Sequence, residues 1–312
     1  MRLRLYENHR FALYAPFYVA HAIGAYSTEG LTVELLLSPG MGLAEQALLD
    51  GSVDVLWAGP MCVMRHHDQN PSSRLVCFAE IVCRDPFSIV GRRPNPDFRL
   101  ADLASIRFAT VSEVPTPWLC LQEDLRQAGL NPERLDRIPD RSMAANLKAL
   151  RAGQLDAAQF FEPFVEEALA SQIGHLWYAA SSRGRTTYTA FITTRERLID
   201  SREPLLRMVR AIFRSQQWVR ARSAYDVASA IASFFSTLDR DLLARALGRY
   251  QMQLVWGSDP VLPEDGFDCL RRCLLSSGFI RRPVSYAECV DNTLARQVIA
   301  EWDHTNTAVM EP

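Results

Sequence analysis

The chain has 312 residues, enough for two domains, and 48% of them are hydrophobic, so it can bury a sizeable core and is not disordered. Its net charge of −2 excludes the basic surface of a nucleic-acid-binding protein. No apolar run approaches the roughly eighteen residues that a membrane-spanning helix requires.

Strand and helix patterns alternate along the first ninety residues. Four segments read as strands: 2–6, 31–37, 53–58 and 74–82. Apolar residues at helical spacing lie between them, over 14–26, 42–51 and 60–69. The last of these begins with proline, which the first turn of a helix tolerates. This β-α-β order predicts an α/β domain with a mainly parallel sheet.

The polar, proline-bearing stretch 91–103 is the predicted connection between two lobes. A second α/β unit then follows, with 134–140 as strand or loop, strands over 106–111 and 155–161, and helices over 116–130, 142–153 and 162–172. After residue 190 the character becomes helical, over 196–235, 239–251 and 266–279. We therefore expect a mostly helical C-terminal third that packs on the first lobe.

The cysteines are odd in number, scattered, and mostly within apolar runs: 62, 77, 83, 120, 269, 273 and 289. This usage predicts buried free thiols rather than a disulfide framework. Cys62 and His66, with His67 and Asp68, could suggest a metal site, but two ligands on one helix face need two more from elsewhere. We expect a core thiol and solvent-facing histidines there, and neither a metal nor a cofactor.

One pattern occurs twice, 102 residues apart. ALLDGSVDVLWAGP (47–60) and ALRAGQLDAAQFFEP (149–163) share a helix end, a glycine, an aspartate, a strand and a proline-started helix. Because helix–glycine–strand is common in α/β proteins, chance could produce the match. The alternative is two lobes of like topology, with Ala58-Gly59-Pro60 and Phe161-Glu162-Pro163 as opposing walls of one binding site.

The segment PFYVAHAIGAYSTEGLTVEL (16–35) resembles the opening signature of ABC-transporter solute-binding proteins for nitrate, sulfonates and thiamine-pyrimidine precursors. GSVDV (51–55) is similar to the family's Gly-x-Val-Asp element, and 100–111 and 128–135 look like the start of its second lobe. The resemblance implies a type II periplasmic-binding-protein fold: two α/β lobes, a ligand cleft and a helical C-terminal region. Lobe I would comprise 1–90 plus 188–312, and lobe II 91–187.

The resemblance also implies a function: two lobes close around a small organic ligand for ABC-type uptake, with an ABC permease as partner. The implied location is periplasmic or lipid-anchored. Polar residues interrupt the N-terminal apolar run at 7–10, so no signal peptide is evident, and a native start at Met1 would make the protein cytoplasmic. The alternatives are a sulfonate or nitrate binder and a cytoplasmic enzyme on the same fold.

The enzyme alternative has little support among the residues. The thiamine pyrimidine synthase on this fold has a lysine where this chain has Trp57 and Ala58, and a cysteine-rich motif where it reads TTYTAFITT (186–194). A desulfinase or decarboxylase would need a nucleophile near the cleft, and Cys62 is the only plausible one. We therefore predict no catalytic residue.

Twelve residues are predicted to bind the ligand: Asn8, His9, Tyr14, Trp57, Ala58, Gly59, Ser112, Thr116, Phe160, Phe161, Glu162 and Tyr188. Most follow a strand or lie where the chain recrosses between lobes, and each could instead cap or pack. A carboxylate at Glu162, beside two phenylalanines, would repel a nitrate or sulfonate but suit a flat heteroaromatic or amine-bearing molecule. The alternative role for Glu162 is to interact with the dipole of its helix.

Overall fold

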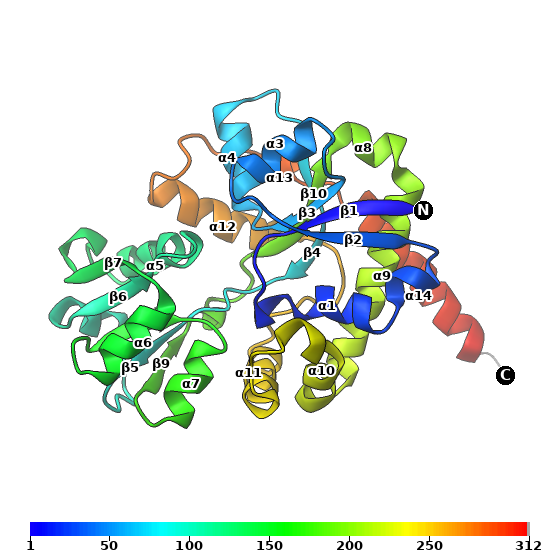
Figure 1. Cartoon of the computed structure of the whole chain (residues 1–312). Coiled ribbons are helices and arrows are strands. Elements are labelled where there is room, and N and C mark those ends of the chain that lie inside the picture. Colours follow the sequence, from blue (N-terminus) through cyan, green and yellow to red (C-terminus); the bar gives the residue numbers. More distant parts are fainter. Residues whose placement is uncertain (311–312) are drawn as a thin grey trace.

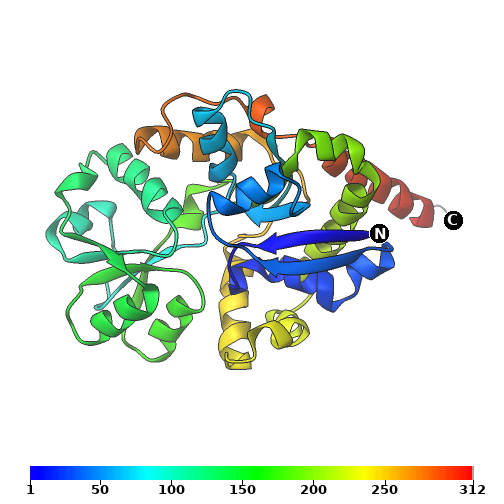
Figure 2. The same cartoon turned by 45° about the horizontal axis from the view of Figure 1, so that its top comes forward.

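The computed structural model describes residues 1–310 and contains two α/β lobes side by side (Figure 1 and Figure 2). The sheet of lobe I has the order β2-β1-β3-β10-β4. Its strands are β1 (Arg2–Glu7), β2 (Thr32–Leu37), β3 (Val55–Ala58), β4 (Leu75–Val82) and β10 (Thr189–Thr194). The sheet of lobe II has the order β7-β6-β8-β5-β9. Its strands are β5 (Ser88–Gly91), β6 (Phe108–Val111), β7 (Arg137–Arg141), β8 (Ala157–Phe160) and β9 (His175–Ala179).

The two sheets have the same construction. In each, three parallel strands are followed by a strand that runs antiparallel to both neighbours, β10 in lobe I and β5 in lobe II. Both of these strands enter directly from the other lobe, through crossovers at 83–87 and 180–188. Two lobes joined by two such crossovers confirm the predicted type II periplasmic-binding-protein fold.

Helices cover both sheets. Lobe I contains α1 (Ala15–Ala22), α2 (Ala25–Thr28), α3 (Leu43–Leu49) and α4 (Met61–Gln69), and lobe II contains α5 (Thr116–Gln127), α6 (Met143–Arg151) and α7 (Phe164–Ala170). The C-terminal region is helical, as predicted, with α8 (Arg195–Asp200), α9 (Arg202–Ala221), α10 (Ala224–Ile231), α11 (Arg240–Met252), α12 (Glu264–Ser276), α13 (Tyr286–Cys289) and α14 (Thr293–Met310). In the part of the chain that the structure describes, no helix combines the length and apolar character needed to cross a membrane.

The repeated sequence pattern forms equivalent positions in the two lobes. β3 and β8 are both the central strand of their sheet, and the preceding Gly51 and Gly153 both have positive φ, at 80° and 71°. Asp54 accepts a hydrogen bond on Oδ2 from the backbone N–H of Arg4, at 2.6 Å. Asp156 does the same for Arg107, at 2.9 Å. The shared aspartate therefore ties the central strand of each lobe to its parallel neighbour, β1 in lobe I and β6 in lobe II.

The predicted connection between the lobes was wrong. The stretch 91–103 lies inside lobe II, between β5 and β6, because β5 already pairs with β8 and β9 before this stretch begins. The boundary expected at residue 90 falls within β5. Neither β5 nor β9 was predicted, since β5 has only four residues, SIVG, and β9 is partly exposed. Both strands are held by partners that are distant in sequence.

The cysteine prediction is confirmed among the described residues: all seven cysteines are free and buried. The expectation for the neighbouring histidines is only partly correct. His67 is buried rather than solvent-facing, and its Nε2 lies 2.9 Å from the carbonyl oxygen of Leu75. His66 is half-buried, with Nδ1 2.7 Å from the hydroxyl of Ser73. These contacts anchor α4 to the loop that leads into β4.

Candidate functional site

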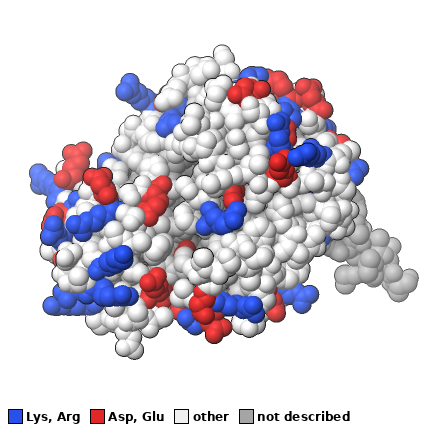
Figure 3. Space-filling model, in the orientation of Figure 1, with Lys and Arg blue, Asp and Glu red and all other residues white. Residues whose placement is uncertain are grey.

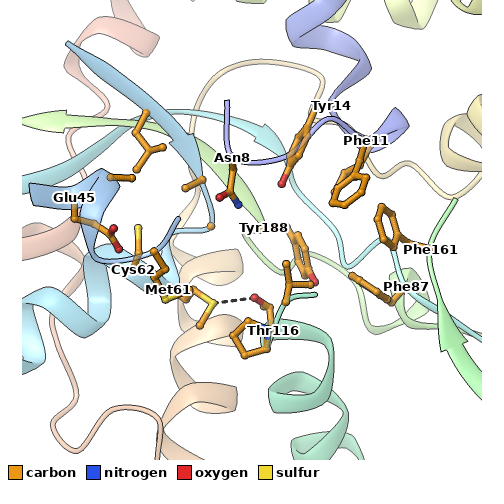
Figure 4. Close-up of a pocket in the computed structure, with 18 residues that line it drawn as sticks. Asn8, Phe11, Tyr14, Glu45, Met61, Cys62, Phe87, Thr116, Phe161 and Tyr188 are labelled. Carbon is orange, nitrogen blue, oxygen red and sulfur yellow. Dashed lines mark hydrogen bonds between the residues drawn. The ribbon is translucent and has the colours of Figure 1, made fainter. Parts of the chain in front are cut away.

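A cavity that is partly open to solvent lies between the two lobes (Figure 4). Lobe I contributes the loop after β1, α3 and the β3–α4 turn, while lobe II contributes the β6–α5 turn and Phe161 after β8. The two crossovers contribute Phe87 and Tyr188. Ligands of open α/β sheets bind at the carboxyl ends of strands, and this cavity lies at the carboxyl ends of strands from both lobes.

Aromatic rings form one side of the cavity (Figure 4). Phe11 of lobe I meets Phe161 of lobe II edge to face, with ring centroids 4.6 Å apart and an interplanar angle of 81°. Phe87 lies against the same Phe161 ring at 5.0 Å. Tyr14 and Tyr188 complete this side. Such rings offer a large apolar surface to a flat ligand.

Two hydroxyl groups, those of Tyr188 and Thr116, lie on the cavity wall. The buried Tyr188 hydroxyl has no hydrogen-bond partner among the described residues, and burial raises the pKa of Tyr188 well above its usual value, so it remains a neutral phenol. Thr116 Oγ1 donates to Met61 Sδ at 2.8 Å, which links the first turn of α5 in lobe II to α4 in lobe I. A buried hydroxyl without a partner loses hydrogen-bond energy unless a ligand or water supplies one.

Glu45 is the only charged side chain among the described residues that line the cavity. It lies on α3 and is 4% exposed. Its Oε2 accepts a hydrogen bond from the backbone N–H of Gly42 at 2.5 Å, which caps the first turn of the helix. The walls therefore carry one carboxylate and neither lysine nor arginine.

The structure brings seven of the twelve predicted residues together on the cavity wall: Asn8, Tyr14, Ala58, Gly59, Thr116, Phe161 and Tyr188. The other five lie elsewhere. Trp57 is fully buried and stacks on Phe17 at 4.2 Å, and Phe160 is fully buried in the core. Ser112 is exposed, and His9 is half-buried beside Phe11, with ring centroids 5.3 Å apart. In a strand, successive side chains point to opposite faces, which takes Trp57 and Phe160 away from the cavity.

Glu162 is the fifth, and its placement corrects the argument that was based on it. The side chain is 1% exposed and lies outside the cavity wall, where its Oε1 accepts a hydrogen bond from Arg249 Nε at 2.7 Å. Its Oε2 accepts from the backbone N–H of Glu166 at 3.0 Å. The carboxylate of the cavity is that of Glu45 instead. In the sequence Glu45 is one residue of a short helix, and only its position three residues after Gly42 marks it, as a capping residue.

Sequence reasoning did not assign eleven lining residues to the ligand site: Phe11, Leu13, Met41, Ala44, Glu45, Leu56, Met61, Cys62, Phe87, Val114 and Pro115. Among them, Cys62 had been considered as a nucleophile. It does line the cavity, but burial and the nearby Glu45 raise the pKa of the Cys62 thiol well above its usual value. Since the thiolate is the nucleophilic form, this environment disfavours reaction at Cys62.

A protein-family model described as the NMT1-like family matches residues 10–233. The chain belongs to the NMT1-like family. YtlA of Bacillus subtilis (strain 168), a candidate binding protein, is 25% identical over 302 residues, which cover 96% of this chain and 90% of that protein. The family assignment confirms the resemblance on which the type II fold was predicted.

Solved structures support the same fold. The alkanesulfonate-binding protein SsuA from Xanthomonas axonopodis pv. citri, bound to MOPS, superposes with a TM-score of 0.71 at 16% identity, covering 94% of this chain and 98% of that chain. The desulfurization enzyme DSZB superposes with a TM-score of 0.69 at 15% identity, covering 96% and 100%. At these identities the similarity shows the fold alone, and this fold includes both binding proteins and an enzyme.

Proposed function

We propose that this NMT1-like protein is a solute-binding protein that closes its two lobes around a small heteroaromatic or amine-bearing molecule for ABC-type uptake. The cavity between the lobes is the observation that carries this proposal. Aromatic rings from both lobes and both crossovers form one side of it, and a few polar groups converge on it. Apolar walls with a small number of oriented polar groups are typical of small-molecule sites.

The charge of the cavity favours a ligand with hydrogen-bond donors. An anionic ligand near the buried Glu45 carboxylate would be repelled, and no lysine or arginine lines the described walls to offset this repulsion. A ring N–H, an amino group or an ammonium group would instead donate to that carboxylate. An aminopyrimidine, the chemistry of the thiamine-pyrimidine branch of the family, combines a flat ring with such donors.

The roles of the lining residues follow from their chemistry. Phe11 and Phe161, one from each lobe, together form the apolar surface against which the ligand ring packs, and Glu45 accepts from its donor edge. Asn8 and Tyr188 orient the remaining polar atoms, because an amide and a phenol can each donate or accept. Delivery to an ABC permease would place the protein on the outer side of the cytoplasmic membrane.

A sulfonate or nitrate ligand is the second candidate, and one observation favours it. The first turns of α4 and α5 both reach the cavity, at Met61 and Thr116, and the free N–H groups of helix N-termini bind anions. An enzyme on this fold would require chemistry at Cys62. Its raised pKa weighs against that, and turnover assays of Cys62→Ala would test it directly.

Two measurements test the proposal. Native mass spectrometry of the purified protein should reveal a co-purified small molecule that contains a nitrogen heterocycle or an amine. In a thermal-shift panel, an aminopyrimidine at a hundred times its dissociation constant should add about 2.7 kcal/mol to the free energy of unfolding. Stabilisation by alkanesulfonates or nitrate alone would refute the proposed ligand class, and product formation from any panel compound would refute a purely binding role.

A further inference from the structure

A second feature between the lobes lies outside the cavity wall. Glu162 and Glu166, at the start of α7 in lobe II, face Arg245 and Arg249 on α11 of the C-terminal region. Arg249 Nε donates to Glu162 Oε1 at 2.7 Å and its Nη2 to Glu166 Oε2 at 2.5 Å. Arg245 Nε donates to Glu166 Oε1 at 2.6 Å. These four side chains are called the α7–α11 cluster below.

The α7–α11 cluster lies where lobe II meets the C-terminal region. α7 and α11 adjoin at the lower edge of the molecule, where the two lobes meet (Figure 1). In the same orientation, acidic and basic atoms lie together along that edge (Figure 3). The ion pairs therefore join two different lobes, whereas the Arg210–Glu301 pair of α9 and α14 lies within the C-terminal region.

The cluster is mostly buried and connects directly to the cavity. The side chains of Glu162 and Glu166 are 1% and 7% exposed, and that of Arg249 is 18% exposed. The backbone N–H of Glu162 also donates to the hydroxyl of Tyr250 on α11 at 2.9 Å. Glu162 directly follows Phe161, which forms part of the aromatic side of the cavity. α11 thus holds both the backbone and the side chain of the residue next to a cavity wall.

We infer that the α7–α11 cluster is a clasp that holds the lobes closed, and that Arg249 and Tyr250 are positioning residues that keep Phe161 in the ligand site. This inference goes beyond the proposed function, because it concerns closure of the lobes and not the identity of the ligand. The clasp acts on the closed form, in which the carboxylates and guanidinium groups are within hydrogen-bond distance.

The expected opening of the lobes follows from the energetics of a buried ion pair that loses one partner. Removing one partner leaves an uncompensated buried charge, which is strongly destabilising. In a two-lobe protein, separation of the lobes returns that charge to water without unfolding either lobe. A variant that lacks the Arg249 charge should therefore shift the protein from the closed form toward an open form.

The test uses the full chain without ligand. Small-angle X-ray scattering of Arg249→Gln should give a larger radius of gyration than the unsubstituted protein, and amide hydrogen exchange in 163–170 should rise about tenfold or more. Arg210→Gln is the matched control, because it removes an arginine that makes two hydrogen bonds to Glu301 but does not join the lobes. Its radius of gyration should remain that of the unsubstituted protein.

Two further variants test whether the α7–α11 cluster holds the lobes closed. Glu162→Gln removes the carboxylate that accepts from Arg249 Nε and should also increase the radius of gyration. If Arg249→Gln does not fold, Arg245→Gln provides the milder change, since Arg245 is 52% exposed, and it should open the lobes to a smaller extent. A folded Arg249→Gln, or Arg245→Gln in its place, with an unchanged radius and unchanged exchange would overturn the inference.

The clasp and the proposed ligand class can each fail independently of the other. Opening of Arg249→Gln in a protein that binds no compound of the thermal-shift panel would support the clasp and count against the proposed ligand class. Ligand binding by a protein whose Arg249→Gln variant stays closed would refute the clasp and leave the proposed function supported.

Discussion

The two contacts that join the lobes on either side of the cavity differ in chemistry. The α7–α11 contact is ionic, with Glu162 and Glu166 against Arg245 and Arg249. The α5–α12 contact is mainly apolar: Leu119 and Cys120 of α5 belong to one buried cluster with Leu270, Cys273 and Leu274 of α12. Water can replace the hydrogen bonds of the first contact, whereas separating the second exposes apolar surface. We therefore expect the lobes to separate at α7–α11 and to remain in contact at α5–α12.

The largest expected change in the free energy of unfolding comes from a substitution in the apolar α5–α12 contact. Leu274→Ala, at a fully buried position of α12, should lower the free energy of unfolding by about 2–5 kcal/mol, because it removes buried methyl groups and leaves a cavity. Urea denaturation measures this change. Leu37→Ala is the matched control, since Leu37 is 71% exposed and its substitution should change stability by less than about 0.5 kcal/mol.

Small-angle X-ray scattering of Leu274→Ala tests which of the two contacts determines closure of the lobes. Folded Leu274→Ala should keep the radius of gyration of the unsubstituted protein, because the ionic contact that holds the lobes closed is unchanged. An open Leu274→Ala would show that the apolar contact, and not the α7–α11 cluster, determines closure.

The next effect is the coupling within the ionic contact. A double-mutant cycle of Glu162→Gln and Arg249→Gln should give a coupling energy in unfolding of about 0.5–3 kcal/mol, since the two side chains share a buried hydrogen bond. The same cycle at Arg2 and Glu34 should give less than about 1 kcal/mol, because Arg2 is 71% exposed and Glu34 is 37% exposed. Equal couplings at the two pairs would contradict the role of burial.

The smallest effect is a pH dependence. Burial raises the pKa of Glu162 from 4.5 to about 7, although Arg249 and the N–H of Glu166 lower it and Glu166 raises it. The native state therefore binds this proton more tightly than the unfolded chain. Its stabilising contribution is complete below pH 4.5 and is lost as the pH rises to about 7. Glu80, whose pKa burial raises to about 8, titrates in the same direction.

Because Glu80 contributes to the pH dependence of stability in the same range, the contribution of Glu162 is measured as the difference between the unsubstituted protein and Glu162→Gln. Chemical denaturation between pH 4 and pH 8 should show a steeper loss of stability for the unsubstituted protein than for Glu162→Gln. The difference in slope should approach one proton at most. Parallel curves for the two proteins would show that Glu162 does not titrate in this range.

Much of the fold could be predicted from sequence because local patterns determine it. The alternation in β1 to β4, the positive-φ glycines at 51 and 153 and the helical spacing of the C-terminal third all depend on neighbouring residues. β5 and β9 could not be predicted, because they are short and depend on partners distant in sequence: β5 pairs with β8 and β9, and β9 pairs with β5. The connection between the lobes was consequently misplaced: the only segment that looked like a linker, 91–103, lies within lobe II.

The ligand site could be predicted only in part, because contacts between segments distant in sequence also determine which side chains face it. Strand ends and the recrossing segment correctly indicated Asn8, Gly59, Thr116, Phe161 and Tyr188 as residues near one cleft. Side-chain direction at a strand end is set by tertiary packing. The sequence therefore could not show that Glu162 turns toward α11, or that Glu45, on a short helix, turns toward the cavity.

Isothermal titration of an aminopyrimidine and an alkanesulfonate into the unsubstituted protein and Glu45→Gln distinguishes the two ligand classes, with the exposed neighbour Gln46→Ala as control. We expect the aminopyrimidine to bind and the sulfonate not to bind. Glu45→Gln should weaken aminopyrimidine binding by about 1.5–3 kcal/mol, the contribution of a hydrogen bond to a charged group, and Gln46→Ala should not change it. Sulfonate binding that Glu45→Gln leaves unchanged or strengthens, without aminopyrimidine binding, would contradict the proposed ligand class and the role of Glu45.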